Sequence, residues 1–260
     1  MRRRSVAVIV LGALMAFGVT AAGAQAPQGP LGPVNALGQE VKRPPAPTGP
    51  VPRLPDGTID LGDGIWVVVP QSGQASMRSA EAVLLPSAKA LLASRRGTDD
   101  PSAWCLPNGV LRYGPYPFRF IQNYTHKRPT HVYILFELHR TFRQVFMDGR
   151  AHPAELDSTW FGHSVGRYEQ DALVIDTVGF NDKSWLDNRG MPHTDRLHTT
   201  ERWTRVDAGH MTSEVTVDDP GAYSRPFTVT SQLTLAAPGD ELMEYVCQEN
   251  NQFGIASGVR

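Results

Sequence analysis

The chain has 260 residues, and its 25 lysines and arginines nearly balance 26 aspartates and glutamates, for a net charge of −1. This composition lacks the basic surplus of a nucleic-acid-binding protein. Without residues 1–24, which hold three arginines and no acid, 22 basic and 26 acidic residues remain. The resulting net charge of −4 also argues against attachment to an anionic membrane surface.

Residues 1–24 have the pattern of a secretory signal peptide. Three arginines precede an apolar run of about a dozen residues, and a small-residue site, Ala22-Gly23-Ala24, follows it. The run is shorter than the roughly 20 residues of a membrane span. No cysteine follows the site to carry a lipid. We therefore expect an exported soluble protein, periplasmic or secreted, with no membrane span.

Residues 25–58 are rich in proline and glycine and show no hydrophobic period, which predicts an extended leader. Such a leader is either a spacer or strap across the domain or a disordered tail. Residues 59–260 are long enough for one β domain with a sizeable core.

The chain after the leader is dominated by strand patterns separated by turn residues. One helical stretch is expected at residues 87–95, after Pro86. The predicted strands are 65–70, 117–123, 131–139, 141–148, 159–168, 172–180, 197–206, 210–219, 227–236 and 241–247.

About ten strands joined mostly by short turns predict an all-β fold. We expect an antiparallel meander that closes into a barrel-like (calycin/lipocalin-like) domain with one short helix. A barrel of this size has room for one small ligand.

The two cysteines, Cys105 and Cys247, allow only one pairing. In an oxidising compartment an even number of cysteines favours a disulfide. The alternatives are two buried free thiols or a redox pair, although a redox pair usually has a CxxC spacing.

Alternation along the strands leaves three ionisable residues, Glu137, His163 and Asp176, among apolar neighbours. Buried charges are costly unless they are paired. Either they form a structural network with Arg143 or Arg167, or they line a pocket.

The hairpin at 159–180 has a turn predicted at residues 169–171, which places His163 opposite Thr177 and Ser164 opposite Asp176. We therefore expect His163 to point into the pocket with three companions, Glu137, Arg143 and His198. A shift of one residue in the turn would instead place His163 and Asp176 on the same face.

The loop at 181–196 is long for a hairpin and holds Trp185 and His193. It is either a pocket cover or an ordered surface loop with Trp185 in the core. The spacing of His193, His198 and Glu201 argues against a local zinc motif, because His198 and Glu201 fall on opposite faces of a regular strand unless a bulge intervenes. A metal held across strands by His163, His193 and His198 remains open. The expected cofactor is thus none or a single divalent metal.

Several segments resemble a family of uncharacterised exported bacterial proteins that share a GHSVGRWEGDTLVVDTxGFND-like segment. The matching segments here are GHSVGRYEQDALVIDTVGFND (162–182), WLD (185–187), PHT (192–194) and LHTTER (197–202). Further similar stretches are PDG (55–57), CLPNGV (105–110), DGRAHP (148–153) and EYVCQEN (244–250). The resemblance implies that the functional site lies among these segments.

The leading functional hypothesis is an exported enzyme that acts on a small molecule in a barrel pocket by histidine–carboxylate acid–base chemistry. Hydrolase, lyase and isomerase reactions all fit. His163 would be the base, oriented by Asp176, with Glu137 or His198 as the acid.

Substrate binding is assigned to Arg143, Arg167, Tyr133, Trp185 and His193, with one of the two arginines holding an anionic oxygen. The alternatives are a periplasmic small-molecule-binding protein without turnover and a structural, envelope-associated module. The expected partner is a small molecule, with no nucleic acid.

Overall fold

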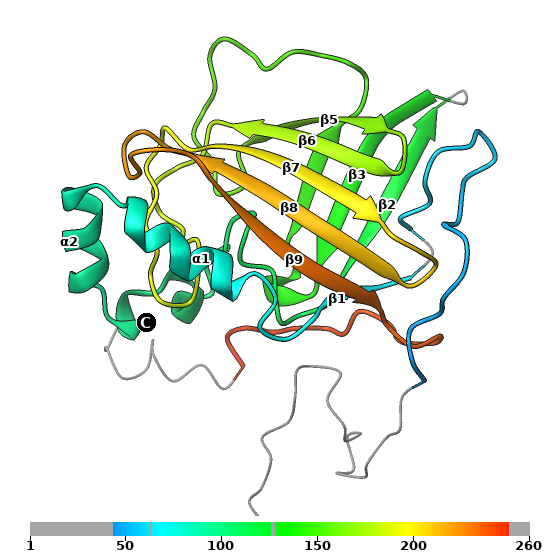
Figure 1. Ribbon diagram of the computed structural model, residues 1–260, viewed down its shortest axis with the longest axis horizontal. Helices are drawn as coiled ribbons and strands as arrows, with labels where there is room; N and C mark the ends of the chain where they lie inside the picture. Colours follow the sequence, from blue (N-terminus) through cyan, green and yellow to red (C-terminus); the bar gives the residue numbers. More distant parts are fainter. Residues whose placement is uncertain (1–43, 63, 126–127, 250–260) are drawn as a thin grey trace, which may run out of the picture.

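The computed structural model describes residues 44–62, 64–125 and 128–249. The predicted signal peptide and residues 25–43 of the leader lie outside these ranges. Figure 1 shows one closed barrel in which each strand pairs with its neighbours in sequence and β1 pairs with β9. The predicted all-β barrel is confirmed.

The strands within the described ranges match the first nine of the ten predicted segments. They are β1 (Trp66–Val68), β2 (Phe118–Thr125), β3 (Arg128–Phe136), β4 (Phe142–Phe146), β5 (His163–Glu169), β6 (Ala172–Val178), β7 (His198–Arg205), β8 (His210–Asp218) and β9 (Phe227–Leu235). The strand predicted at 241–247 is wrong, because β9 already pairs with β8 on one edge and β1 on the other.

The described ranges contain two short α-helices and several 3-10 turns, whereas the sequence predicts one helix. They are α1 (Gln74–Ala80), η1 (Glu81–Val83), α2 (Pro86–Ser94), η2 (Gly97–Asp99), η3 (Pro101–Trp104) and η4 (Leu138–Arg140). The predicted helix corresponds to α2, which begins at Pro86. A seven-residue helix such as α1 has little periodic signal, and tertiary contacts through buried Met77 and Ala80 hold it. No helix in the described ranges is long and apolar enough to cross a membrane.

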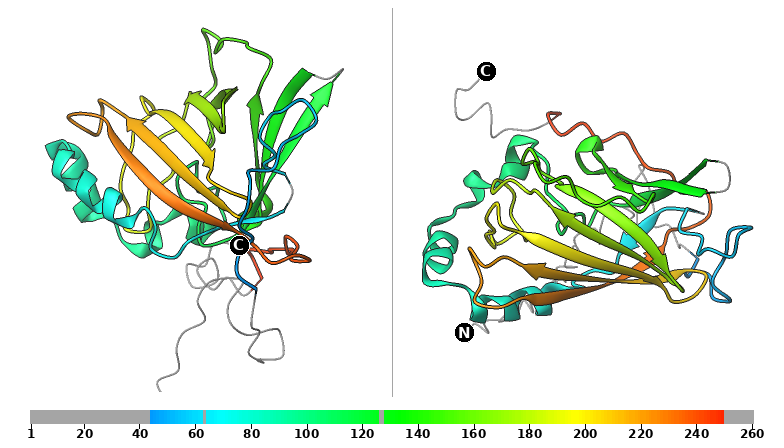
Figure 2. Two further views of the ribbon diagram at one scale, coloured as in Figure 1. Left: turned by 45° about the vertical axis from the view of Figure 1, so that its right-hand side comes forward. Right: turned by 90° about the horizontal axis from the view of Figure 1, so that it is seen from above.

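One strand pair departs from the expected antiparallel meander. β4 and β5 run parallel, with Val145 opposite Ser164 and Phe146 opposite Val165. A parallel pair needs a long crossover, and residues 147–162 supply it. In Figures 1 and 2 this segment is the large green loop that rises beside β5 and β6. The crossover carries His152, which becomes important below.

Side chains fill the interior of the barrel. Trp66, Phe118, Phe120 and Trp203 are among its largest fully buried residues. Gly166 lies where a Cβ atom would come within 2.7 Å of side-chain atoms of Met147 and Val145. The barrel therefore has a packed core where the sequence predicts a ligand pocket.

The two barrel ends are covered by different parts of the chain. Residues 51–61 lie across one end, where Ile59 and Leu61 are fully buried and Arg53 contacts Asp171 in the β5–β6 turn. The last part of the predicted leader is thus a strap. At the other end, α1, α2 and residues 180–197 contribute to a second apolar cluster, which includes Met77, Ala88 and Leu197.

Cys105 and Cys247 form the predicted disulfide, with Cα atoms 5.6 Å apart. The bond holds the segment after β9 near the β3–β4 connection. There the backbone N–H of Met243 donates to the Glu137 carboxylate at 2.8 Å.

Replacing both cysteines by serine should lower the free energy of unfolding by about 2–5 kcal/mol, because the bond closes a long loop in the unfolded chain. The sequence separation of the pair is 142 residues. Urea unfolding followed by circular dichroism measures the change. The reduced wild-type protein should unfold at the same midpoint as the variant. A variant as stable as the oxidised wild type would contradict this role.

Candidate functional site

Four polar side chains meet on the outer face of the barrel over β5, β6 and β7. His163 comes from β5, Asp176 from β6 and His198 from β7, and His152 reaches them from the β4–β5 crossover. We call these four residues the histidine–aspartate cluster. The side chains of His152, Asp176 and His198 are 20%, 31% and 41% exposed, so solvent and small molecules reach them.

The β5–β6 turn decides that His163 and Asp176 share a face. The turn has two residues, and Gln170 takes a positive φ of 54°, as tight hairpin turns require. Val165 therefore lies opposite Asp176, and His163 lies opposite Val178. The predicted turn has three residues, one more than the observed turn. This difference shifts the strand pairing by one position and places His163 and Asp176 on the same face, the alternative that the sequence left open.

The hydrogen bonds form a continuous chain. His152 Nε2 lies 2.9 Å from Asp176 Oδ1, and His198 Nε2 lies 2.7 Å from Asp176 Oδ2. On its other side, His152 Nδ1 lies 2.8 Å from His163 Nδ1. Asp176 is the only carboxylate in this series of hydrogen bonds, and each of its two oxygens bonds one histidine.

The donor and acceptor roles in this chain follow from the carboxylate, because an ionised carboxylate only accepts hydrogen bonds. The proton of neutral His152 must be on Nε2, so its Nδ1 accepts. His163 then donates from Nδ1, which leaves its Nε2 as an unprotonated nitrogen. The same reasoning places the proton of neutral His198 on Nε2 and leaves its Nδ1 as an acceptor.

The surroundings of the cluster favour the neutral form of His163 and the ionised form of Asp176. Burial, with smaller contributions from His152 and Arg150, lowers the pKa of His163 below its ordinary value of 6.5. Burial raises the pKa of Asp176, but hydrogen bonds from His198 and His152 lower it more, and the net shift is downwards. At neutral pH the cluster therefore holds a carboxylate and a neutral His163 imidazole.

An aromatic neighbour holds the His163 ring in place. Phe146 of β4 stacks on it, with ring centroids 5.1 Å apart and an angle of 22° between the planes. Arg150 covers the Phe146 ring, its guanidinium carbon 4.0 Å from the ring centroid. This packing restricts rotation of His163, so its Nδ1 stays directed at His152.

Arg143 lies inside the barrel, away from the cluster. It makes a two-point ion pair with Glu201, and its nitrogens also donate to Ser164 at 3.1 Å and Thr177 at 2.7 Å. Trp203 Nε1 donates to Glu201 at 3.1 Å. The Arg143 and Glu201 side chains are 2% and 0% exposed. This is a satisfied, buried structural network, so the geometry does not favour the predicted substrate role of Arg143, which stays a prediction.

Glu137 lies apart from His163, in the β3–β4 connection. It accepts the Met243 N–H, and burial raises the pKa of its carboxyl. The expected grouping of His163 with Glu137, Arg143 and His198 is therefore correct only for His198. The expected inward direction of His163 is wrong as well, because Ser164 and not His163 faces the interior.

The remaining predicted contacts are dispersed. Arg167 is 63% exposed and pairs with Glu169 on the surface. Tyr133 lies on the outer face of β3, stacked on His131 with ring centroids 5.5 Å apart. Trp185 is buried beneath Arg95, so the loop at 181–196 places it in the core and does not form a lid.

His193 is also buried within that loop. It accepts from the Ser184 hydroxyl at 2.7 Å and donates from Nδ1 to the Thr194 carbonyl at 3.1 Å. Burial lowers its pKa. Because His193 is separate from His163 and His198, the metal set that combines these three residues is not assembled. The part of the chain that the structure describes contains no group of three or more His, Cys, Asp or Glu residues suited to a metal ion.

His152 is the member of the cluster that sequence reasoning misses. It stands in an aperiodic crossover, where strand alternation says nothing about direction. Its segment, DGRAHP (148–153), is one of the stretches for which a family resemblance is expected from the sequence, and this is the one signal that points to it. All four residues of the cluster in fact come from such stretches.

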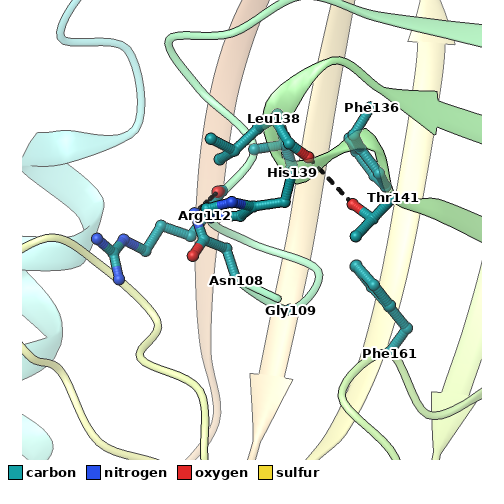
Figure 3. A pocket seen from close by; sticks show the side chains of 9 residues that line it. Asn108, Gly109, Arg112, Phe136, Leu138, His139, Thr141 and Phe161 are labelled. Carbon is teal, nitrogen blue, oxygen red and sulfur yellow. Dashed lines mark hydrogen bonds between the residues drawn. The ribbon is translucent and has the colours of Figure 1, made fainter. Parts of the chain in front are cut away.

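A small cavity near η4, shown in Figure 3, is lined by polar side chains such as Asn108 and His139 and by apolar ones such as Phe136 and Phe161. His139 and Arg140 take positive φ angles of 58° and 48° there. The buried atoms Asn108 Oδ1 and His139 Nδ1, on residues that line the cavity, have no hydrogen-bond partner among the described residues. The cavity has a volume of about 10 Å³, enough for one water molecule and too small for a substrate.

No protein-family model, no curated protein and no solved structure matches this chain. The candidate site therefore rests on the geometry of its own residues.

The structural role of Arg143 can be tested against Arg167, the other arginine predicted to bind substrate. Arg143→Met leaves the Glu201 carboxylate buried without its charge partner and should cost about 3–5 kcal/mol of unfolding free energy. Adding Glu201→Gln should restore part of this loss. Arg167→Met removes an exposed pair and should change stability by less than about 0.5 kcal/mol. Equal effects of the two arginine variants would refute the assignment.

The protonation pattern of the cluster can be read directly from ¹⁵N chemical shifts of labelled histidines. At pH 7.5, His163 should carry its proton on Nδ1 and His152 on Nε2. Asp176→Asn introduces a side chain that also donates, so His152 should populate both forms. Detection of the Nε2–H form of His163 in the wild-type protein would show that the chain runs the other way.

Proposed function

We propose that this protein is an exported enzyme that transfers a proton to or from a small-molecule substrate at the histidine–aspartate cluster. The observation that carries the proposal is the hydrogen-bonded chain from Asp176 through His152 to His163. It leaves His163 Nε2 as a neutral base with no hydrogen-bond partner among the described residues. Export is supported by the disulfide and by the signal-peptide pattern of residues 1–24.

The chain stabilises the charge that proton abstraction creates. When His163 Nε2 accepts a proton, the ring becomes positive while its Nδ1–H still donates to His152. His152 is in turn bonded to the Asp176 carboxylate, whose negative charge offsets part of the positive charge on His163. A positioned base of this kind typically contributes about 10²–10⁴-fold to a rate.

His198 supplies the complementary role from the other side of Asp176. Its Nε2–H bond to Asp176 orients the ring and leaves its Nδ1 without a bond to the carboxylate. β5 and β7 flank β6, so the backbones that carry His163 and His198 are about 10 Å apart, two strand spacings. When His198 carries a second proton, on Nδ1, a small molecule on this face meets a base on one side and an acid on the other, as elimination, isomerisation and water-mediated hydrolysis all require.

A substrate-independent test uses 5-nitrobenzisoxazole, whose ring opens when a base removes its C–H proton. The N–O bond breaks in the same step and releases a coloured cyanophenolate. The wild-type protein should accelerate this reaction, and His163→Gln should lower the rate at least about 100-fold. His210→Gln is the matched control, because His210 also bonds a carboxylate, Asp207, at 2.8 Å, but lies elsewhere.

The pH dependence follows from the sign of the His163 shift. Its folded pKa lies below 6.5, so the active neutral form persists at pH 7 and is lost only as the pH falls through that lower value. The rate should therefore be flat above pH 7 and reach half its maximum below pH 6.5. A midpoint above 6.5, or equal loss of rate in His210→Gln, would refute His163 as the base.

A further inference from the structure

A cleft of about 480 Å³ opens at the end of the barrel covered by the helices. It lies between α1, the first residues of β9, the segment 111–115 and the loop 186–189. Figure 1 shows α1 beside β9 at this end. None of the lining residues belongs to the histidine–aspartate cluster, so this is a separate site. Its volume lies within the range of small-molecule pockets, about 300–1,000 Å³.

The floor of the cleft is apolar and fixed. Met77, Tyr113, Leu186 and Val229 contribute to it, and each is more than nine-tenths buried. The chain at the start of α1 lies directly on β9, because a Cβ on Gly73 would come within 2.6 Å of Ser231 Oγ. These walls belong to the packed core, so the cleft is formed before any ligand enters.

The three arginines that line the cleft differ in what they can offer a ligand. Arg112 donates to the carboxylate of Asp100 and the amide oxygen of Asn188. Arg189 donates to the carboxylates of Asp187 and Glu81, so both arginines already have side-chain partners. Arg78 makes one long hydrogen bond, 3.4 Å to Gln74. Within the described ranges no carboxylate lies at ion-pair distance from Arg78. Its guanidinium is therefore the available cation.

We propose that this cleft binds a small molecule that combines an apolar ring body with one anionic group. The body packs on the floor beside Met77 and Leu186, and a carboxylate or sulfonate accepts hydrogen bonds from Arg78. A polyphosphate does not suit the site, because the single charge of Arg78 cannot balance several phosphate charges. The proposal is independent of proton transfer at the histidine–aspartate cluster.

The test uses 8-anilinonaphthalene-1-sulfonate, which has fused rings and one sulfonate, and follows its fluorescence during titration of the oxidised protein. We expect saturable binding at one site per chain. Leu111→Trp places an indole in the cleft and should abolish this binding. Arg78→Gln should weaken it about 10-fold, since a charge-assisted hydrogen bond is lost.

Two further arms keep the result decisive. Gln74→Glu sets a carboxylate beside Arg78 without touching the floor, so it should also weaken binding, whereas Arg196→Gln, an exposed arginine outside the cleft, should not. The uncharged probe N-phenyl-1-naphthylamine should bind Arg78→Gln and wild type equally. Unchanged sulfonate binding in either Arg78→Gln or Leu111→Trp, or a lack of saturation in the wild type, would overturn the proposal. Thermal unfolding confirms that each variant is folded.

Discussion

The buried ion pair between Arg143 and Glu201 is the constraint on which both faces of the barrel wall depend. A charged pair in an apolar interior is tolerated only if all its hydrogen bonds are made. Here Ser164, Thr177 and Trp203 complete them. A slip of one residue in β4 or β7 would turn one member of the ion pair outwards and leave the other unpaired, and a slip in β5 or β6 would remove a hydroxyl that accepts from Arg143. The network therefore specifies the register of β4 to β7.

The same strand register also positions the outer histidine–aspartate cluster. His163 precedes Ser164, Asp176 precedes Thr177, and His198 lies three residues before Glu201, so each outward residue is set by an inward neighbour on its strand. Rigid strands place these three side chains, and the crossover adds His152. A site supported in this way is pre-organised, which is what proton transfer between fixed partners requires. The two proposed sites use different parts of the barrel, the sheet face and the helical end.

Three short stretches, 148–153, 162–182 and 197–202, contain the inward network residues Ser164, Thr177 and Glu201 together with all four members of the outer cluster. One strand segment thus serves stability with one face and chemistry with the other. A substitution in it therefore has to be judged by the face it alters, and a loss of function alone does not distinguish an unfolded barrel from a damaged site.

The sequence by itself determined where nine of the strands lie and which residues of a strand share a face, because alternation and turn residues are local properties, and it favoured the pairing of the two cysteines. It placed His198 and Glu201 on opposite faces correctly. It did not determine which face points inwards, because alternation separates the two faces of a strand without saying which one is buried. Arg143 and His163 are both polar, so their side chains do not distinguish the faces either. Only the tertiary structure decided this, through the two-residue turn at Gln170 and the parallel pairing of β4 with β5. The crossover that this pairing demands also brought His152 to the cluster, a contact between residues whose local pattern carries no period.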